Sequence, residues 1–361
     1  MISNKKIKVA VGMSGGVDST MAAFILKKQG FDVIGLTMVT WDGKHSGKKT
    51  QAGCYGPGQA ANVKDAKKAA AMLGIPHRVI NLKKEFRKEI LSYFRKEYAS
   101  GRTPNPCVIC NRKIKFGQLI GKALKSGILF DYFATGHYAR IYFDKKKNIY
   151  FVKKGADKSK DQSYFLYRLK QSQLKRVIFP LGGKMKKDVR KLAEKNGFGY
   201  FARKKESQNF AGCGSYAELL PKGKEGNIVD FEGKILGKHK GIANYTPGQR
   251  RNLNLGGLKE PYYVLEIDAA NNSIIAGPRK LAFSSKVTVK NLNWVISPRS
   301  VKNSVKAAIR YGGKPANARF IFKNKNRAVL KFKKPQFAVA PGQSIVFYEK
   351  DLLLGGGIIS K

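Results

Sequence analysis

A phosphate-binding loop is the clearest chemical feature of this sequence. Two glycines lie between an apolar run at 7–11 and a helical pattern that starts near Ser19. A strand that turns through glycines into a helix gathers backbone N–H groups at the positive end of the helix dipole, where a pyrophosphate can bind. Asp18 is placed to hold the magnesium ion that bridges such phosphates. The segment therefore predicts an ATP site formed by Ser14, Gly15, Gly16, Val17, Asp18 and Ser19.

An ordinary glycine turn is the alternative, but six ordered residues at a strand–helix junction are rare by chance. The Walker pattern G-x-x-x-x-G-K-[ST] does not occur in the sequence. The loop therefore differs from the phosphate loop of kinases and GTPases.

A second candidate site is the stiff loop G-R-T-P-N-P-C-V-I-C-N at 101–111. Its two prolines fix the backbone and present Cys107 and Cys110 at the start of a helix. Because Arg102, Arg112 and Lys113 lie nearby in the sequence, we expect the thiolate to be favoured, as a nucleophile or a metal ligand requires. A structural zinc site or simple buried thiols are the alternatives. Zinc would need four ligands, so Cys54, Cys213 or a histidine would have to complete the set.

Composition indicates a polyanionic partner. The chain of 361 residues has 71 lysines and arginines against 23 acidic residues, a formal charge of +48. Such an excess favours nucleic acid, although a lysine-rich solvated surface would explain part of it. The length predicts two or three domains.

Membrane insertion and secretion are not expected. The sequence has no run of 18 or more apolar residues, and Met1 lies almost directly before the first predicted strand. Four cysteines make no disulfide scaffold. We therefore expect a cytoplasmic protein.

The first half of the chain alternates strand and helix patterns, with glycines where helices should end, at Gly30, Gly74 and Gly127. This order predicts an α/β fold, a doubly wound parallel sheet with ligands outside the carboxyl ends of its strands. The strands are expected at Val9–Gly12, Asp32–Thr37, His77–Asn81 and Tyr132–Thr135. The helices are expected at Thr20–Lys28, Asn62–Leu73, Lys83–Ala99 and Lys113–Lys125.

Beyond about Phe210 the pattern changes to short β-like runs, which predict a small barrel or sandwich near the C-terminus. Residues 281–361 contain 16 lysines and arginines but only 2 acidic residues. A basic β module suits a nucleic-acid backbone, and a solvated barrel surface is an equally weighted alternative. The C-terminal strands are expected at Val287–Val289, Val305–Ile309, Ala318–Phe322, Ala328–Phe332 and Ser344–Tyr348. We expect domains at 1–209, 210–280 and 281–361.

The phosphate loop resembles that of the N-type ATP pyrophosphatases, which cleave ATP between the α and β phosphates. Over its whole length the chain resembles the tRNA-specific 2-thiouridylases of that superfamily, which replace the 2-oxygen of the wobble uridine with sulfur. The landmarks occur in the family's order, at Gly12–Ser19, Leu36–Trp41, the C-x-x-C loop at 101–111, Ala134–Arg140, Lys160–Tyr164, Glu206–Gln208, Thr246–Arg250, Arg310-Tyr311 and Pro341–Gln343.

This resemblance implies an adenylating domain, a small central domain and a C-terminal β-barrel, with Cys110 as nucleophile. ATP and Mg²⁺ would be used, tRNA would be the partner, and sulfur would come from a donor protein (a cysteine desulfurase or relay) or from inorganic sulfide. The implied ATP contacts are Gly12, Met13, Ser14, Gly15, Gly16, Val17, Asp18, Ser19, Met38 and Gly136. The implied tRNA contacts are Asn105, Pro106, Cys107, His137, Lys160, Asp161, Gln162, Arg310, Tyr311 and Gln343.

Residue types are compatible with these implied roles. Lys160 suits a phosphate, and Asp161 and Gln162 suit a splayed base edge. Arg310 and Tyr311 pair a guanidinium with a stacking ring. Taken without the resemblance, the same residues would be interpreted as a polar turn and a strand end, His137 as a buried structural histidine, and Met38 as core.

The sequence departs from the commoner family pattern at two positions that concern sulfur. Cys107 replaces the aspartate of N-P-D-x-x-C, and the second family cysteine falls on Ala211. Cys213, two residues on, or Cys54 would have to take its place.

Two mechanisms remain open at this point. In a relay, Cys110 is the nucleophile and a second cysteine carries a persulfide, so a disulfide forms on turnover. In a cluster mechanism, Cys107, Cys110 and either Cys213 or Cys54 hold an iron–sulfur cluster with one free iron. Cys107 favours the cluster.

Other functions compete with this one. Argininosuccinate and asparagine synthetases share the phosphate loop but have no use for the C-x-x-C loop or a basic barrel. A 2-thiocytidine tRNA thiolase would share chemistry and partner. A non-catalytic basic tRNA-binding protein with an ATP fold is disfavoured by the intact loop with Asp18 and by Cys110.

Overall fold

The computed structural model describes residues 6–43, 53–206, 210–212, 216–220, 223–296, 298, 301 and 303–360. Cys213 lies outside the described residues, as do Ser207 and Gln208 of the Glu206–Gln208 landmark. The chain forms two compact units. One consists of residues 1–90, 107–215 and 351–353, and the other of 91–106, 216–350 and 354–361.

A five-stranded sheet is the centre of the first unit, with the strand order β3-β2-β1-β4-β7 and parallel pairing throughout. The last residue of β1, Gly12, pairs with Leu36 of β2 and Thr135 of β4, so these strands end at one edge. The predicted doubly wound sheet is confirmed, and the short β7 was not predicted. The strands are β1 Lys8–Gly12, β2 Asp32–Val39, β3 His77–Asn81, β4 Tyr132–Thr135 and β7 Val177–Ile178.

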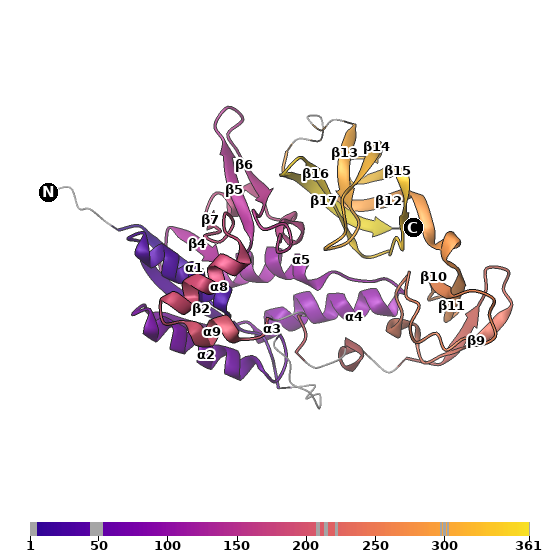
Figure 1. Cartoon of the computed structure of the whole chain (residues 1–361), viewed down its shortest axis with the longest axis horizontal. Coiled ribbons are helices and arrows are strands. Elements are labelled where there is room, and N and C mark those ends of the chain that lie inside the picture. Colours follow the sequence, from indigo (N-terminus) through magenta and orange to yellow (C-terminus); the bar gives the residue numbers. More distant parts are fainter. Residues whose placement is uncertain are drawn as a thin grey trace. The chain divides into compact units, whose positions relative to one another are not determined.

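Helices cover both faces of this sheet (Figure 1). Val9 and Val11 of β1 are fully buried in one core with residues of α1 (Val17–Lys28), α2 (Gln59–Met72), α8 (Lys186–Lys195) and α9 (Gly199–Arg203). On β4, Ala134 belongs to that core, whereas the neighbouring Phe133 contacts the ring of Phe116 from the helix after the C-x-x-C loop. Alternate strand residues therefore face different helix layers.

Two helical stretches each contain a π-helical turn. The first keeps the predicted bounds Lys83–Ala99, whereas the second starts earlier than predicted. The first is continuous from α3 (Lys83–Phe86) through η1 (Arg87–Leu91) to α4 (Ser92–Ala99). The second begins at Pro106, seven residues earlier than expected, because proline suits the first helical position. It comprises α5 (Pro106–Cys110), η2 (Asn111–Gln118) and α6 (Leu119–Lys125). Gly30, Gly74 and Gly127 have φ values of 88°, 56° and 77°, as expected of helix ends.

The first unit also carries a β-hairpin that extends from the sheet, with β5 at Ala139–Asp144 and β6 at Ile149–Lys154 (Figure 1). Short helical turns follow it at η3 (Ser163–Leu166) and α7 (Gln171–Leu174). These turns lead the chain back to β7 and then to α8.

The second unit contains a four-stranded sheet and a six-stranded barrel. The sheet has the order β10-β11-β8-β9, and the barrel closes because β12 pairs with both β15 and β17. Of the predicted barrel or sandwich, the barrel is therefore found, and its glycine-rich strand β17 was not expected. The bounds are β8 Gly226–Val229, β9 Ile235–His239, β10 Tyr262–Asp268, β11 Ser273–Pro278, β12 Phe283–Trp294, β13 Ser304–Ala308, β14 Ala316–Asn324, β15 Arg327–Phe337, β16 Ser344–Glu349 and β17 Leu352–Ser360, with short turns η4 Tyr216–Leu219, η5 Ile242–Asn244 and η6 Arg279–Ala282.

No helix among the described residues is long and apolar enough to cross a membrane.

Candidate nucleotide and thiol site

The glycine-rich loop leads from β1 directly into α1. Gly15 has φ +73°, and a Cβ there would lie 2.4 Å from the carbonyl oxygen of Asn62. The position therefore requires glycine for both its backbone angle and its space. The Ser14 amide donates to Ser19 Oγ at 3.1 Å, and the Ser19 hydroxyl donates to the Gly16 carbonyl at 3.1 Å. These bonds fix the loop at the N-terminus of α1, the geometry that suits a bound phosphate.

Three further predicted ATP contacts lie at the same edge of the sheet. Met13 is 3% exposed, and its amide donates to the Leu36 carbonyl at 2.8 Å. Gly136 follows β4, and a Cβ there would lie 2.7 Å from the carbonyl carbon of Asp18. Met38 is half-buried at the carboxyl end of β2. Parallel pairing thus brings these positions together although they are distant in sequence.

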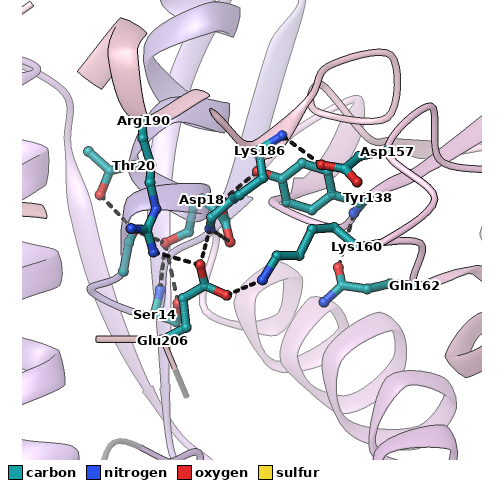
Figure 2. A network of polar contacts seen from close by, with 12 residues as sticks. Ser14, Asp18, Thr20, Tyr138, Asp157, Lys160, Gln162, Lys186, Arg190 and Glu206 are labelled. Carbon is teal, nitrogen blue, oxygen red and sulfur yellow. Dashed lines mark hydrogen bonds and ion pairs between the residues drawn. The ribbon is translucent and has the colours of Figure 1, made fainter. Parts of the chain in front are cut away.

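Asp18 forms an ion pair with Lys186 of α8, as Figure 2 shows. Lys186 Nζ donates to both carboxylate oxygens, at 2.6 and 2.7 Å, and the Tyr138 hydroxyl donates to Oδ1 at 2.9 Å. Burial and the neighbouring carboxylate of Asp18 raise the pKa of Tyr138, which stays protonated as a donor. The Lys186 amide donates to Asp157 Oδ2 at 2.9 Å, which anchors the first turn of α8.

Glu206 collects three cations beside this pair (Figure 2). Lys160 and Arg190 donate to it at 2.9 and 2.8 Å, and Lys186 Nζ lies 3.2 Å from Oε1. Burial by itself raises the pKa of Glu206, but the hydrogen bond from Lys160 and the charge of Lys186 outweigh it and lower the pKa to about 2. Glu206 is therefore ionised at every physiological pH.

The contacts of the Asp18 carboxylate bear on its predicted role as a ligand of Mg²⁺. Mg²⁺ would bind through one or two carboxylates and the phosphates of the substrate. Both oxygens of Asp18 already accept hydrogen bonds from Lys186. As arranged here, the Asp18 carboxylate is thus matched to an ammonium rather than to a metal ion.

The C-x-x-C thiols lie in the first helical turns after Pro106, but the predicted ease of ionisation is wrong. Burial raises the pKa of Cys107 to about 11 and that of Cys110 to about 12. Cys110 is only 7% exposed and stands at the fourth residue after Pro106 rather than at the helix start. The flanking cations are also engaged elsewhere, since Arg102 pairs with Glu97 and Lys113 pairs with Glu89. Desolvation is therefore the dominant effect on the pKa values of the two thiols.

Lys115, which the sequence did not single out, is the cation that acts on these thiols. Its charge lowers the pKa of both Cys107 and Cys110 against the larger effect of burial. Burial lowers the pKa of Lys115, but charges on Cys54, Cys110 and Cys107 together outweigh it, so that this pKa is raised.

Cys54 belongs to the same region. Burial is the main cause of the raised pKa of Cys107 and of Cys110, and a negative charge on Cys54 would raise both further. Tyr55 pairs with Ala211, the position of the second family cysteine, and the Gly212 amide donates to the Tyr55 carbonyl at 2.7 Å. The segment around Cys54 thus lies against the residues that precede Cys213.

An iron–sulfur cluster needs a converging ligand set. Within the described ranges, no group of three or more histidine, cysteine or acidic side chains could hold a metal ion. Cys54, Cys107 and Cys110 therefore do not form such a set by themselves, and Cys213 lies outside these ranges.

The predicted tRNA contacts in the first unit are engaged within the protein. Asp161 Oδ1 accepts the amides of Gly155 and Ser163, each at 3.0 Å, and Gln162 Oε1 accepts the Tyr138 amide at 3.0 Å. These are the contacts of the polar turn that residue types alone suggested. The Lys160 side chain contacts a residue outside this turn, because its partner Glu206 belongs to the network around the phosphate loop.

His137 is held by Thr135 Oγ1, 2.7 Å from Nδ1, and packs against the rings of Phe116 and Phe179. Burial lowers its pKa well below the usual value, and the charge of Lys115 adds to this. The ring is therefore neutral at physiological pH.

In the second unit, Gln343 supports the loop that precedes the cysteines. Its Nε2 donates to the carbonyl oxygens of Thr103 and Pro104, at 3.3 and 3.2 Å. Asn105 in this loop is 8% exposed, and its amide donates to the Tyr93 hydroxyl at 3.4 Å. Gln343 is thus a structural partner of the loop.

Arg310 and Tyr311 stand in the turn after β13. Both residues are exposed, Tyr311 by 45%. They therefore lie at the surface of the barrel.

Sequence reasoning missed several residues of the site: Lys115, Tyr138, Asp157, Lys186, Arg190 and the role of Glu206. One signal was available, because Lys186 and Arg190 are spaced i, i+4 on a helix and must share a face. Nothing in the sequence indicated that this face meets Asp18.

Comparisons with protein families and curated relatives identify the family of the chain. The chain matches the model of the tRNA methyl transferase HUP domain over residues 7–213, the PRC-barrel domain of the same name over 217–278 and the aminomethyltransferase beta-barrel domain over 284–359. It is 46% identical over 360 residues to a tRNA-specific 2-thiouridylase MnmA of Endomicrobium trichonymphae, covering 98% of this chain and 99% of that protein. The chain belongs to the tRNA-specific 2-thiouridylase family.

Other members are similarly close. A tRNA-specific 2-thiouridylase MnmA 2 of Thermoanaerobacter sp. (strain X514) is 46% identical over 363 residues, covering 98% of both chains. Among solved structures, a 4-thiouridine synthetase in complex with RNA and ATP aligns with a TM-score of 0.36 and 20% identity over 56% of this chain and 44% of that chain. That likeness is too low to bear on function.

Proposed function

We propose that this protein catalyses the ATP-dependent thiolation of tRNA at the 2-position of the wobble uridine. The observation that carries the proposal is the presence, in one compact unit, of a phosphate loop with a cationic network and a helix that carries Cys107 and Cys110. Phosphate binding and sulfur chemistry are the two capacities that this reaction needs. The names of relatives at 46% identity support the same substrate.

The first step is adenylation, which converts a poor leaving group into a good one. The 2-oxygen of uracil attacks the α-phosphate of ATP, the α–β bond breaks, and pyrophosphate leaves. The N–H groups at the start of α1 stabilise the charge that develops on the phosphates. Mg²⁺ carried by the phosphates of ATP would add to that stabilisation, whereas the Asp18 carboxylate is occupied by Lys186.

The second step delivers sulfur to the activated carbon. A sulfur nucleophile attacks C2, and AMP leaves with the former 2-oxygen. In the relay hypothesis a second cysteine carries a persulfide sulfur and then forms a disulfide with Cys110, which a thiol reductant must restore. Cys110 must lose its proton in this scheme, and its high pKa makes that deprotonation a separate requirement.

The identity of the second sulfur site is also part of the proposal. Cys54 is supported by its electrostatic effect on Cys110, and Cys213 by its position two residues after Ala211. An iron–sulfur cluster would need three of the four cysteines, and anaerobic purification with iron and sulfide analysis tests it directly.

Binding of tRNA is attributed to the basic surfaces, with Arg310, Tyr311 and Lys160 as candidate contacts. A sulfur-donor protein or inorganic sulfide would complete the reaction, and we expect it to take place in the cytoplasm. The divisions at about 209 and 280 stay predictions.

A reaction with purified tRNA tests the proposal. The protein, an unmodified tRNA transcript, ATP, Mg²⁺ and a sulfur source are expected to yield 2-thiouridine in digested tRNA, with AMP and pyrophosphate in equal amounts. A cysteine desulfurase with cysteine supplies persulfide sulfur for the relay, and sulfide is supplied in a separate reaction for the cluster mechanism. Cys110→Ser should abolish the thiolated nucleoside because serine supplies neither a thiolate nor a soft ligand.

Other products would redirect the assignment. 2-Thiocytidine would indicate the related cytidine enzyme, a methylated nucleoside would indicate methyl transfer, and ADP would contradict adenylation. Tight tRNA binding with no nucleotide turnover would indicate a non-catalytic binding protein.

A further inference from the structure

Lys186 is the most enclosed cation of the network beside the phosphate loop. Its side chain is 8% exposed, compared with 37% for Lys160 and 43% for Arg190. An ammonium has three protons to donate. Two contacts, at 2.6 and 2.7 Å, go to Asp18, and the third, to Glu206, is longer at 3.2 Å. The contact with Glu206 is therefore the one that is most easily exchanged for another acceptor.

Arg190 lies one helical turn further along α8 and faces the same way. It donates to Glu206 Oε1 at 2.8 Å, while its Nε atom is buried and has no hydrogen-bond partner among the residues that the structure describes. A buried donor without an acceptor is unfavourable. An anion that reached this face of α8 would supply the missing acceptor.

The charges of the network also favour an anion. The ion pairs join three cations, Lys160, Lys186 and Arg190, to only two carboxylates, Asp18 and Glu206. The third carboxylate in Figure 2, Asp157, accepts the backbone amide of Lys186 instead of pairing with a cation of this group. The loop residues at the N-terminus of α1 add oriented N–H groups. Both features point at the place where the proposed function requires a triphosphate.

We propose that Lys186 and Arg190 form a phosphate clamp that binds the polyphosphate of ATP and stabilises the departing pyrophosphate. This inference rests on the proposed function for the identity of the nucleotide. Asp18 keeps Lys186 in position, and on binding, Lys186 exchanges its long contact with Glu206 for a phosphate oxygen. Arg190 uses its unpaired Nε in the same way. The negative charge of Glu206 remains balanced by Lys160.

Direct binding measurements on the full chain test the clamp. Lys186→Met and Arg190→Gln are compared with the wild type and with Lys187→Met, a matched control at the next, exposed position of α8. Isothermal titration calorimetry measures the affinity of each protein for ATP. The affinity for adenosine, which has no phosphates, is measured in the same way.

Loss of a charge-assisted hydrogen bond should weaken ATP binding roughly tenfold to a hundredfold in Lys186→Met and about tenfold in Arg190→Gln. The Lys187→Met control should stay within about twofold of the wild type because an exposed lysine contributes little. Adenosine should bind equally to all four proteins. Lys186→Arg, which keeps the charge, should restore most of the ATP affinity.

The outcomes separate the clamp from the proposed function. If the wild type binds neither ATP nor adenosine, the proposed function fails. If the wild type binds ATP and both clamp variants bind it equally well, the clamp is wrong. Equal weakening of ATP and adenosine also overturns it, because that result indicates a distorted loop. Circular dichroism shows whether each variant is folded. If Lys186→Met does not fold, the ATP affinities of Arg190→Gln and Lys186→Arg test the clamp in its place.

Discussion

The proton on Cys110 limits what this thiol can do in the free protein. With a pKa of about 12, and about 11 for Cys107, roughly one thiol in a thousand or fewer is ionised at pH 8. Burial is the cause, and the ammonium of Lys115 opposes it. The strongest charge that acts on the Cys110 thiol thus comes from a residue that is neither a nucleophile nor a ligand.

Lys115→Met should make both thiols still harder to ionise. We expect alkylation by iodoacetamide at Cys107 and Cys110 to slow by about three- to tenfold at a given pH, the effect of up to roughly one pKa unit. Mass spectrometry of the labelled peptides between pH 7 and 11 measures the rates. Lys113→Met is the control, since Lys113 is paired with Glu89. Equal rates in Lys115→Met and wild type across this range would contradict the electrostatic role.

Single replacements should rank the other cysteines. We expect either Cys54→Ser or Cys213→Ser to abolish 2-thiouridine formation as fully as Cys110→Ser, because one distant thiol must complete the sulfur site. Cys107→Asp distinguishes the mechanisms, since a relay should tolerate it, whereas a cluster should lose iron, brown absorbance and activity together. Nucleoside analysis and iron content measure these effects. If neither distant cysteine matters, both mechanisms fail as written.

At the scale of elements, the phosphate loop is fixed by its neighbours rather than by its own bonds alone. α2 closes on Gly15 through Asn62, the end of β4 places Gly136 against α1, and α8 brings Lys186 to Asp18. Each contact joins elements that are adjacent only because the sheet order is β3-β2-β1-β4-β7.

Gly136→Ala should therefore damage the nucleotide site. The new Cβ would lie 2.7 and 2.8 Å from backbone atoms of Asp18 and Ser19, which cannot move aside as a flexible side chain does. We expect a loss of about 1–3 kcal/mol in the free energy of unfolding and at least about tenfold weaker ATP binding. Gly121→Ala in α6, with open space around it, should instead stabilise by about 0.5–1 kcal/mol. Thermal denaturation measures the stability of both variants, and calorimetry measures their ATP affinity. If Gly136→Ala had the stability and ATP affinity of the wild type, the close packing at this position would be refuted.

On the scale of the whole molecule, the structural role of the barrel and its candidate role in tRNA binding are hard to separate by deletion. Its basic surface is a candidate for tRNA binding. Gln343 also holds the backbone of Thr103 and Pro104. Removal of residues 281–361 would therefore disturb the loop before Cys107 as well as tRNA affinity. Substitution of exposed basic residues of the barrel separates the two effects, because it changes tRNA binding and leaves the contacts of Gln343 in place.

The salt dependence of tRNA binding should report on the barrel. Lys323, Lys325 and Arg327 are exposed at the turn between β14 and β15. Their joint replacement by glutamine should lower the slope of log affinity against log salt by about 2 to 3, because each phosphate contact releases counterions. The same change at Lys83, Lys84 and Lys88, exposed in the first unit, is the control. Filter binding between about 50 and 200 mM salt measures both. Equal slopes for the two variants would show that this turn does not contact tRNA phosphates.

Local sequence determined the features that depend on neighbouring residues. The glycines of the phosphate loop, the four main parallel strands and the helix ends at Gly30, Gly74 and Gly127 follow from backbone preferences that act over a few positions. The alternation of strand and helix then predicted the doubly wound sheet, because parallel strands need crossover connections. Strand β17 was missed since its run of glycines hides a strand pattern.

Tertiary structure decided the chemistry of the site. Whether a thiol is ionised depends on burial and on charges that arrive from other elements, and neither is encoded next to Cys110. The partner of Asp18 is 168 residues away in the chain, and its contact exists only after α8 packs beside α1. The sequence thus predicts which residues can bind phosphate or carry sulfur, whereas long-range packing and desolvation determine their charge state and their partners.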